Sequence, residues 1–276
     1  MSYPPGFARN LAFRVTTAVV ALPLLLLAFF RGPRWLGVAL VAGALVAGLV
    51  EFFALLAARG LVPMRSTGLA LAAAMFVDVA TPGWNAGPVW PLAALLLLTV
   101  ALRPGRALED TVPAAALTLL GALYLGALGG TIGALFLMPP VEAGPWRILL
   151  LLAIIMAADT VAFFVGHALG RHRLAPALSP AKTVEGALGG IVGGVLGALV
   201  VRSWGFPTLP LLDALVLGAV VAALGIVGDL DESLLKRWAG VKDSGRLFPG
   251  HGGALDRLDG LLFGAPILYY YFLVAR

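Results

Sequence analysis

The sequence predicts an all-α integral membrane protein, a polytopic bundle of about nine transmembrane helices with a cytoplasmic N-terminus. Of its 276 residues, 61% are hydrophobic and only 12% are charged, whereas a soluble domain carries about 25% charged residues. Apolar runs recur along the whole chain between short polar gaps. The net charge of +5 is spread over these gaps and forms no basic domain, so nucleic acid is not an expected partner.

The apolar runs are the candidate membrane spans, because about 20 apolar residues cross a bilayer. They are residues 11–30, 35–58, 67–82, 88–102, 112–138, 148–170, 186–204, 209–230 and 259–275. The runs 67–82 and 88–102 are short for a full crossing. The first run resembles a signal peptide, but it is long enough to span and Ala28-Phe29-Phe30 offers no small-residue cleavage site. We therefore expect it to be retained as the first helix.

The lysines and arginines set the expected orientation. With the N-terminus inside, most of the 19 basic residues fall in gaps on the cytoplasmic side. This places the two long polar gaps, 171–185 and 231–258, as cytoplasmic loops. We expect residues 1–147 to form a scaffold of transmembrane helices that could support dimerisation, and residues 148–276 to form a second region that carries both loops.

Glycines recur every four residues in the run 186–204. They are Gly186, Gly189, Gly190, Gly193, Gly194 and Gly197. Small residues at this spacing let helix backbones approach closely. The pattern predicts either packing within the chain or a dimer interface.

Charged residues follow the run 209–230 directly, and charges in or beside spans are costly and usually functional. If the helix continues, Asp229, Ser233, Lys236 and Arg237 share one face. A carboxylate with cations one and two turns further on suits a metal-bridged polyphosphate. A helix end that snorkels to the membrane surface with an internal ion pair explains the same residues.

The next segment combines glycines with acids. Gly250, Gly252 and Gly253 allow backbone N–H groups to face phosphate oxygens. Asp256 and Asp259 follow on the opening turn of the last helix, where carboxylates complement the helix dipole. Two acids directly after a glycine-rich loop exceed what capping needs. The chain has no cysteine, and carboxylate oxygens are the ligands that Mg²⁺ prefers.

Two stretches before residue 231 also contain polar residues that need partners. Ser179 is a suitable N-cap and Pro180 suits the first helical position. A helix that begins there would direct its N-terminus and Lys182 at a bound anion, unless it is simply a capped helix. Asp159 lies within an apolar run and needs a cation, a metal or a helix end as partner. Glu51, in the second span, is expected to pair with an arginine.

The three polar stretches resemble one known family. The motif Ser233-x-x-Lys236-Arg237-x4-Lys242-Asp243-x-Gly245-x3-Pro249-Gly250-His251-Gly252-Gly253-x2-Asp256-Arg257-x-Asp259 resembles the C-terminal motif of phosphatidate cytidylyltransferases, the CDP-diacylglycerol synthases. The stretches Ser179-Pro180-Ala181-Lys182-Thr183-x-Glu185-Gly186 and Ala158-Asp159-Thr160-x-Ala162-Phe163-Phe164-x-Gly166 are similar to two others of that family. Ala181 and Ala254 depart from the family pattern.

This resemblance implies an enzyme that transfers the cytidylyl group of CTP to phosphatidate, giving CDP-diacylglycerol and pyrophosphate for phospholipid synthesis. It implies a multi-pass protein of the cell inner membrane whose active site faces the cytoplasm, and a homodimer. The implied cofactor is Mg²⁺, with a second cation such as K⁺, on Asp229, Asp256 and Asp259. The implied catalytic residues are Asp229, Lys236, Arg237, Asp256, Arg257 and Asp259. The implied substrate-binding residues are Asp159, Ser179, Lys182, Thr183, Ser233, Lys242, Asp243, His251, Gly252 and Gly253.

Two other functions stay open. One is a CTP-dependent polyprenol or phytol kinase or another lipid cytidylyltransferase, although the His-Gly-Gly segment argues against the kinases. The other, from a different class, is a transporter or channel, because intramembrane acids and glycine-rich helices suit that function too. Inverted repeats are not apparent, and a transporter has no need of a phosphate-binding loop.

Overall fold

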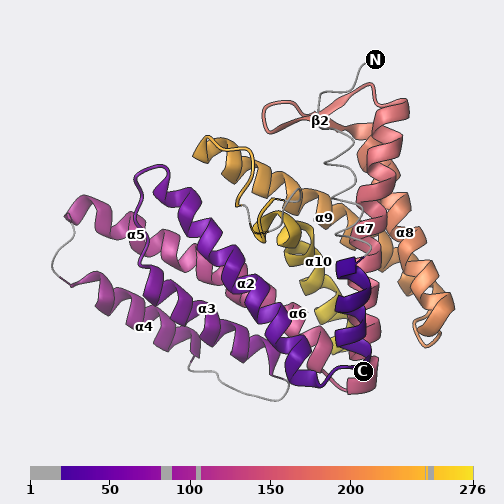
Figure 1. The fold of residues 1–276 in the computed structure, drawn as a ribbon, viewed down its shortest axis with the longest axis horizontal. Coiled ribbons are helices and arrows are strands. Elements are labelled where there is room, and N and C mark those ends of the chain that lie inside the picture. The colour runs from indigo at the N-terminus through magenta and orange to yellow at the C-terminus, as the bar shows by residue number, and fades with distance from the viewer. Residues whose placement is uncertain (1–19, 82–88, 104–106, 246, 248–251, 276) are drawn as a thin grey trace.

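The computed structural model describes residues 20–81, 89–103, 107–245, 247 and 252–275 (Figure 1). The described chain is helical except for short connections and one two-stranded hairpin. Every predicted span corresponds to a described helix, and residues 11–19 of the first span lie outside the described residues.

The first half of the chain forms one group of helices. A short apolar helix, Val20–Arg31, comes first. It is followed by α2 (Arg34–Ala57), α3 (Arg65–Ala80), α4 (Val89–Ala101), α5 (Leu108–Gly121), the π-helical segment η1 (Ala122–Ala127) and α6 (Leu128–Leu137). Helix α3 packs against η1 and α6, and α4 against α5.

The second half forms a group of long helices with the hairpin at one end (Figure 1). It runs through η2 (Val141–Ala143), α7 (Gly144–Leu169), β1 (Arg173–Ala175), β2 (Ser179–Thr183), α8 (Val184–Gly205), α9 (Leu211–Ala239) and α10 (Leu255–Val274). Helix α8 packs between α7 and α9, and α9 packs against α10.

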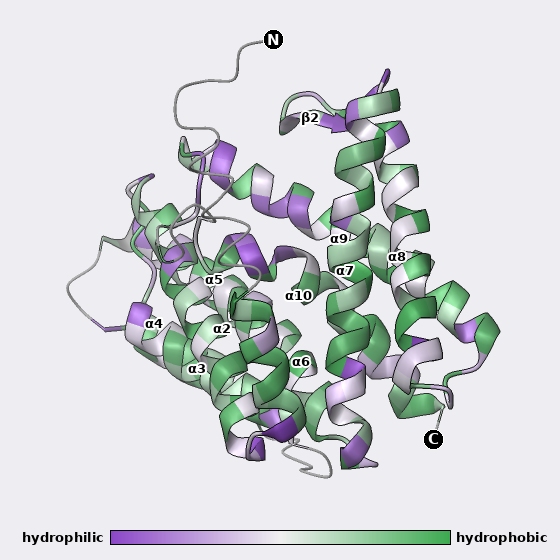
Figure 2. Ribbon diagram, turned by 45° about the vertical axis from the view of Figure 1, so that its right-hand side comes forward, coloured by the Kyte–Doolittle hydropathy of each residue, from purple (hydrophilic) through white to green (hydrophobic). Residues whose placement is uncertain are grey.

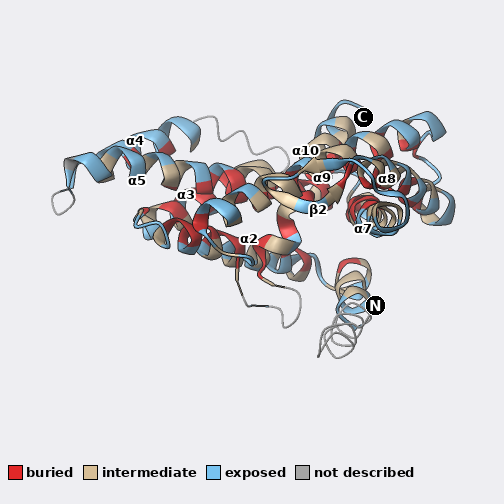
Figure 3. Ribbon diagram, turned by 90° about the horizontal axis from the view of Figure 1, so that it is seen from above, coloured by how far each residue is buried: buried red, intermediate tan, exposed pale blue. Residues whose placement is uncertain are grey.

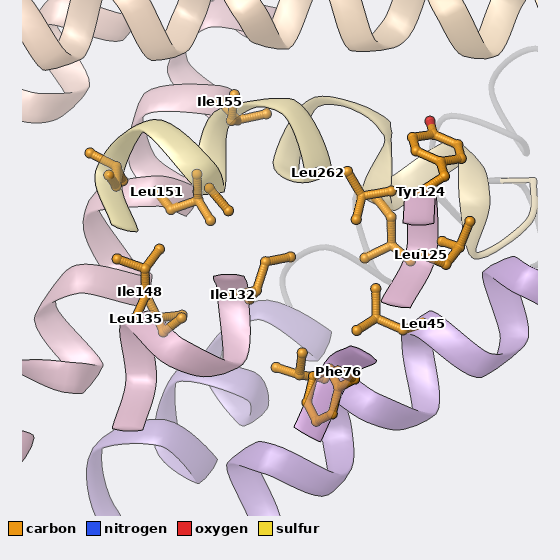
Figure 4. Packing of buried hydrophobic residues seen from close by; sticks show 14 of the residues in the cluster. Leu45, Phe76, Tyr124, Leu125, Ile132, Leu135, Ile148, Leu151, Ile155 and Leu262 are labelled. Carbon is orange, nitrogen blue, oxygen red and sulfur yellow. The ribbon is translucent and has the colours of Figure 1, made fainter. Parts of the chain in front are cut away.

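Helix α10 joins the two halves, because it packs against α9 and also against α2 and α6. Figure 4 shows Leu262 of α10 in one apolar cluster with Leu45 of α2, Ile132 of α6 and Ile155 of α7. Seen from above, buried residues lie along the inner parts of α2 and α3 and around α9 and α10, and exposed ones follow the outer helices α4 and α8 (Figure 3). The start of α10 is therefore enclosed by elements from both halves.

The described helices have the character of membrane spans. Five segments are long and apolar enough to cross a bilayer: Arg34–Ala57, Glu109–Leu137, Val141–Leu169, Val184–Gly205 and Leu211–Ala239. Their outward faces are apolar (Figure 2). On α8 the exposed residues include Leu188, Val192, Leu196 and Val200, which lie one turn apart. A mainly helical chain with helices long and apolar enough to cross a membrane is confirmed, while nine crossings and a cytoplasmic N-terminus stay predictions.

Two of the predicted boundaries are wrong. The loop predicted over 231–258 is shorter, because α9 continues to Ala239 and ends at Gly240, whose φ of 75° is left-handed. Ser179 is not the N-cap of a helix but lies in β2, paired with Ala175 of β1. The cap of α8 is Thr183, whose Oγ1 accepts a hydrogen bond of 3.1 Å from the Gly186 N–H. Strand pairing has thus overridden the local Ser-Pro signal.

The glycines of 186–204 serve packing within the chain. Added Cβ atoms at Gly186, Gly190, Gly193 and Gly197 would meet backbone oxygens of α7. At Gly194 a Cβ would lie 2.5 Å from the Ala222 Cβ and 2.8 Å from the Gly218 carbonyl oxygen, both on α9. These glycines therefore hold α7, α8 and α9 together, which was the intramolecular alternative.

We predict that Gly194→Ala lowers the melting temperature in detergent, because overpacking a tight helix contact costs about 1–3 kcal/mol. Gly43→Ala is the matched control, since Gly43 also lies inside a helix but an added Cβ meets nothing within 4 Å. There the better helix propensity of alanine is expected to raise stability by up to about 1 kcal/mol. Equal melting temperatures for the two variants would contradict this account of α8.

Candidate active site

Three carboxylates from two helices meet where α9 crosses α10. Asp229 and Glu232 lie one turn apart on α9, and Asp259 lies on the first turns of α10. One oxygen from each lies within 4.8 Å of the others. The helices approach closely here because Gly228 has no side chain; a Cβ on it would overlap the Asp259 carbonyl. We call Asp229, Glu232 and Asp259 the acid cluster.

The acid cluster has the chemistry of a divalent-cation site. Glu232 is only 1% exposed, and its Oε1 has no hydrogen-bond partner among the described residues. An ionised buried oxygen without a partner is costly, and a bound cation would satisfy it. Hard oxygen ligands suit Mg²⁺, so the residues present fit the predicted metal.

Glu232 was not among the predicted metal ligands. It is part of an acidic run with Asp229 and Asp231, and an i, i+3 spacing from Asp229 was the available signal for a shared helix face. The predicted ligand Asp256 is directed elsewhere. Its role as a ligand stays a prediction, because the structure shows its carboxylate engaged with the chain.

Lys236 ties the acid cluster to Asp256. Its Nζ lies 2.6 Å from Glu232 Oε2 and 2.6 Å from Asp256 Oδ1. The three side chains are well shielded, with exposed fractions of 14% for Lys236, 1% for Glu232 and 7% for Asp256. A cation between two buried carboxylates offsets part of their mutual repulsion. The ion pair within α9 that was the alternative explanation is therefore present, between Lys236 and Glu232. We call Glu232, Lys236 and Asp256 the charged centre.

The second oxygen of Asp256 organises the loop before α10. Oδ2 accepts hydrogen bonds from the Gly253 N–H at 2.7 Å, the Ser244 N–H at 3.1 Å and the Ser244 hydroxyl at 2.7 Å. Gly252 has a φ of 80°, and a Cβ on it would lie 2.5 Å from Asp256 Oδ2. Glycine is thus required here for backbone conformation and for space. His251, a predicted substrate ligand, lies outside the described residues, as does Gly250.

A pocket of about 640 Å³ opens beside the acid cluster, bounded by α7, the hairpin, α8 and α9. Its polar lining includes Asp159, Lys182 and Asp229, and Lys182 forms an ion pair with Asp229. Phe163 and Ile226 are among its apolar lining residues. Two of the three stretches singled out in the sequence, those around Asp159 and Lys182, therefore meet Asp229 of α9 at this pocket.

The other predicted site residues are more dispersed. Arg237 donates from Nε to the Leu178 carbonyl at 3.1 Å, which ties the end of α9 to the hairpin. Thr183 lines the pocket and caps α8. Ser179 and Ser233 are half-buried, and Lys242, Asp243 and Arg257 are exposed.

Glu51 of α2 also reaches this region. Its Oε2 accepts hydrogen bonds from the Ser244 hydroxyl at 3.1 Å and from the Leu255 N–H at 2.9 Å. The expected pairing with an arginine is therefore wrong among the described residues. Sequence reasoning could not have found these partners, because the segments lie about two hundred positions apart along the chain.

Known proteins resemble this chain over much of its length. The model of the cytidylyltransferase family matches residues 12–275. The phosphatidate cytidylyltransferase of Synechocystis sp. is 33% identical in an alignment that covers 94% of this chain and 95% of that protein. Those of Brucella abortus and Haemophilus influenzae are 40% and 39% identical, over 45% and 48% of this chain and 46% and 47% of their own lengths. The chain belongs to the cytidylyltransferase family.

Proposed function

We propose that this enzyme transfers the cytidylyl group of CTP to phosphatidate, forming CDP-diacylglycerol and pyrophosphate. The observation that carries the proposal is the convergence of the acid cluster with a pocket that has a cationic and an apolar wall, in a chain of this family. A polyphosphate needs cations, and a diacyl lipid needs an apolar surface. The pocket offers both within one space.

The proposed reaction is an in-line displacement. A phosphate oxygen of phosphatidate attacks the α-phosphorus of CTP, and the bond from that phosphorus to the β-phosphate oxygen breaks, so pyrophosphate leaves with the bonding electrons. No general base is required, because a phosphate monoester is already largely ionised near neutral pH. Transfers of this kind depend mainly on positioning and on charge neutralisation.

The chain's own residues would supply these two functions. Asp229, Glu232 and Asp259 would hold Mg²⁺, which would neutralise phosphate charge when bound. Lys182 would contact phosphate oxygens from the pocket wall, where it now pairs with Asp229. Asp256 would act by fixing Lys236 and, through the Gly253 N–H, the loop before α10. A second cation such as K⁺ remains part of this proposal.

We further propose that the active site faces the cytoplasm, where CTP is found, from a position in the cell inner membrane. The positive-inside distribution of lysine and arginine supports this orientation. A homodimer is also proposed, although the glycines of α8 are used within the chain and do not supply its interface. Family membership over most of the chain leaves the transporter without a supporting observation.

We predict that Asp259→Asn abolishes both products when purified protein is given phosphatidate, labelled CTP and Mg²⁺, because the metal site loses one of its charges. Lipid-extractable label and pyrophosphate are followed together, with Asp78→Asn as control, since Asp78 accepts a hydrogen bond from Trp90 and belongs neither to the acid cluster nor to the pocket lining. Phosphorylated polyprenol or phytol in place of CDP-diacylglycerol would move the enzyme to the kinases.

The same assay separates the two acids of α10. Asp256→Asn is also expected to remove nearly all turnover, but Mn²⁺ binding in the absence of nucleotide should persist, whereas Asp259→Asn should weaken it about tenfold or more. Loss of Mn²⁺ binding in Asp256→Asn would restore Asp256 as a metal ligand. Turnover like that of the wild type in either variant would contradict the site.

We predict that Gly252→Ala lowers kcat/KM about tenfold or more, because charged hydrogen bonds worth about 1.5–3 kcal/mol are displaced around Asp256. Gly60→Ala is the matched control: Gly60 has a φ of 75°, but a Cβ on it meets nothing within 4 Å. Both variants bear the same backbone strain, of about 1–2 kcal/mol. If the two variants retain equal activity, the loop does not depend on the space at Gly252.

A further inference from the structure

Glu51 is the one described carboxylate of the first half of the chain that hydrogen-bonds to the loop and helix of the proposed active site. It is half-buried on α2. Both of its hydrogen bonds end on the same oxygen, Oε2, which accepts from the Ser244 hydroxyl and from the Leu255 N–H. One oxygen thus joins the loop to the first residue of α10.

The contact with Leu255 caps the start of α10, where no neighbouring side chain in the sequence acts as a cap. The first N–H groups of a helix have no partner within it and are usually satisfied by the side chain at the N-cap. Here the N-cap is Ala254, which makes no side-chain cap. Glu51 takes over that role from another helix, and its negative charge complements the positive end of the α10 dipole.

The backbone at Gly245 and Gly253 packs directly against the Glu51 carboxylate. Added Cβ atoms at Gly245 and Gly253 would both overlap its carboxyl oxygens. Glycines at these two positions therefore let the loop close around the carboxylate. The fit is specific to a side chain of this length that ends in an acceptor.

Ser244 connects Glu51 to Asp256 of the charged centre. Its hydroxyl lies 3.1 Å from Glu51 Oε2 and 2.7 Å from Asp256 Oδ2. A hydroxyl carries one hydrogen, so it can donate to one carboxylate at a time, while the Ser244 N–H donates to Asp256. Asp256 in turn contacts Lys236, and Lys236 contacts Glu232 of the acid cluster.

We propose that Glu51 is a positioning residue of the transfer reaction, which caps α10 and holds Ser244 so that Asp256 and Asp259 are correctly placed. The kinetic part of this inference rests on the proposed function. Because the hydrogen bonds of Glu51 end on one acceptor oxygen, a substitution that keeps this oxygen in place and substitutions that remove or withdraw it give opposite expectations.

Glu51→Gln keeps the length and an acceptor oxygen for both donors, so kcat should stay within about threefold of wild type. Glu51→Met keeps a similar length without an acceptor and should lower kcat about tenfold or more, which corresponds to about 1.4 kcal/mol. Glu51→Asp keeps the charge but withdraws the oxygen, and should behave like Glu51→Met. The KM for CTP should change less than about threefold in all three, because the pocket around Lys182 is untouched. Glu142→Gln, at an exposed acid, is the control.

Amide hydrogen exchange gives a readout that does not depend on the lipid substrate. In the full-length protein, the peptide covering residues 252–258 should exchange faster in Glu51→Met and Glu51→Asp than in wild type or Glu51→Gln, while peptides of α8 stay unchanged. If Glu51→Met fails to fold, Glu51→Asp carries the same comparison.

The outcomes separate the two proposals. Unchanged kcat and unchanged exchange in Glu51→Met, or equal losses in Glu51→Gln and Glu51→Met, would overturn the positioning role. Wild-type protein that forms no CDP-diacylglycerol, with exchange that still follows the acceptor, would overturn the proposed function and leave the cap of α10 supported.

Discussion

The charged centre of this enzyme depends on Lys236, a shielded ammonium group that contacts Glu232 on its own helix and Asp256 on the next. Taking three charges out of water is expensive, and their attraction repays the cost only when the geometry is good and further hydrogen bonds are made. Here Asp256 receives hydrogen bonds from Ser244 and Gly253 as well. The ion contacts therefore fix how α9 meets α10 and also how the loop between them is folded.

Such a centre requires two helices to come unusually close. Lipid removes the hydrophobic force between helices, so small residues and polar contacts must hold them. At the crossing of α9 and α10, Gly228 faces the Asp259 backbone and Gly225 faces Gly260. Without side chains at these glycines, carboxylates from two helices can share a space small enough for one cation.

Much of this arrangement could be predicted from the sequence, because it is periodic or local. Apolar runs of membrane length predicted the helices, and the spacing of Asp256 and Asp259 placed both acids at the start of α10. The grouping of Asp159, Lys182 and Asp229 in one pocket was within reach only through the family resemblance. Composition and periodicity carry no information about which segments converge.

The parts that could not be predicted are tertiary. Ser179 and Pro180 predicted the start of a helix. In the structure they lie in β2, which pairs with β1, and α8 is capped by Thr183. The contacts of Asp256 with Lys236 and with the loop could not be predicted, nor could the position of Glu232 beside Asp229 and Asp259. Glu51 was expected to pair with an arginine, but its partner at the start of α10 is the Leu255 N–H.

The most direct test of the charged centre is a double-mutant cycle between Lys236→Met and Asp256→Asn, measured as thermal unfolding in detergent with Lys242→Met, at an exposed lysine, as control. Removing one partner of a buried ion pair costs about 3–5 kcal/mol, because the other charge is left uncompensated. We therefore expect Lys236→Met to destabilise strongly and the double variant to be more stable than the sum of the single effects predicts, with a coupling of about 1 kcal/mol or more. Additive effects, with Lys236→Met no worse than Lys242→Met, would contradict the account.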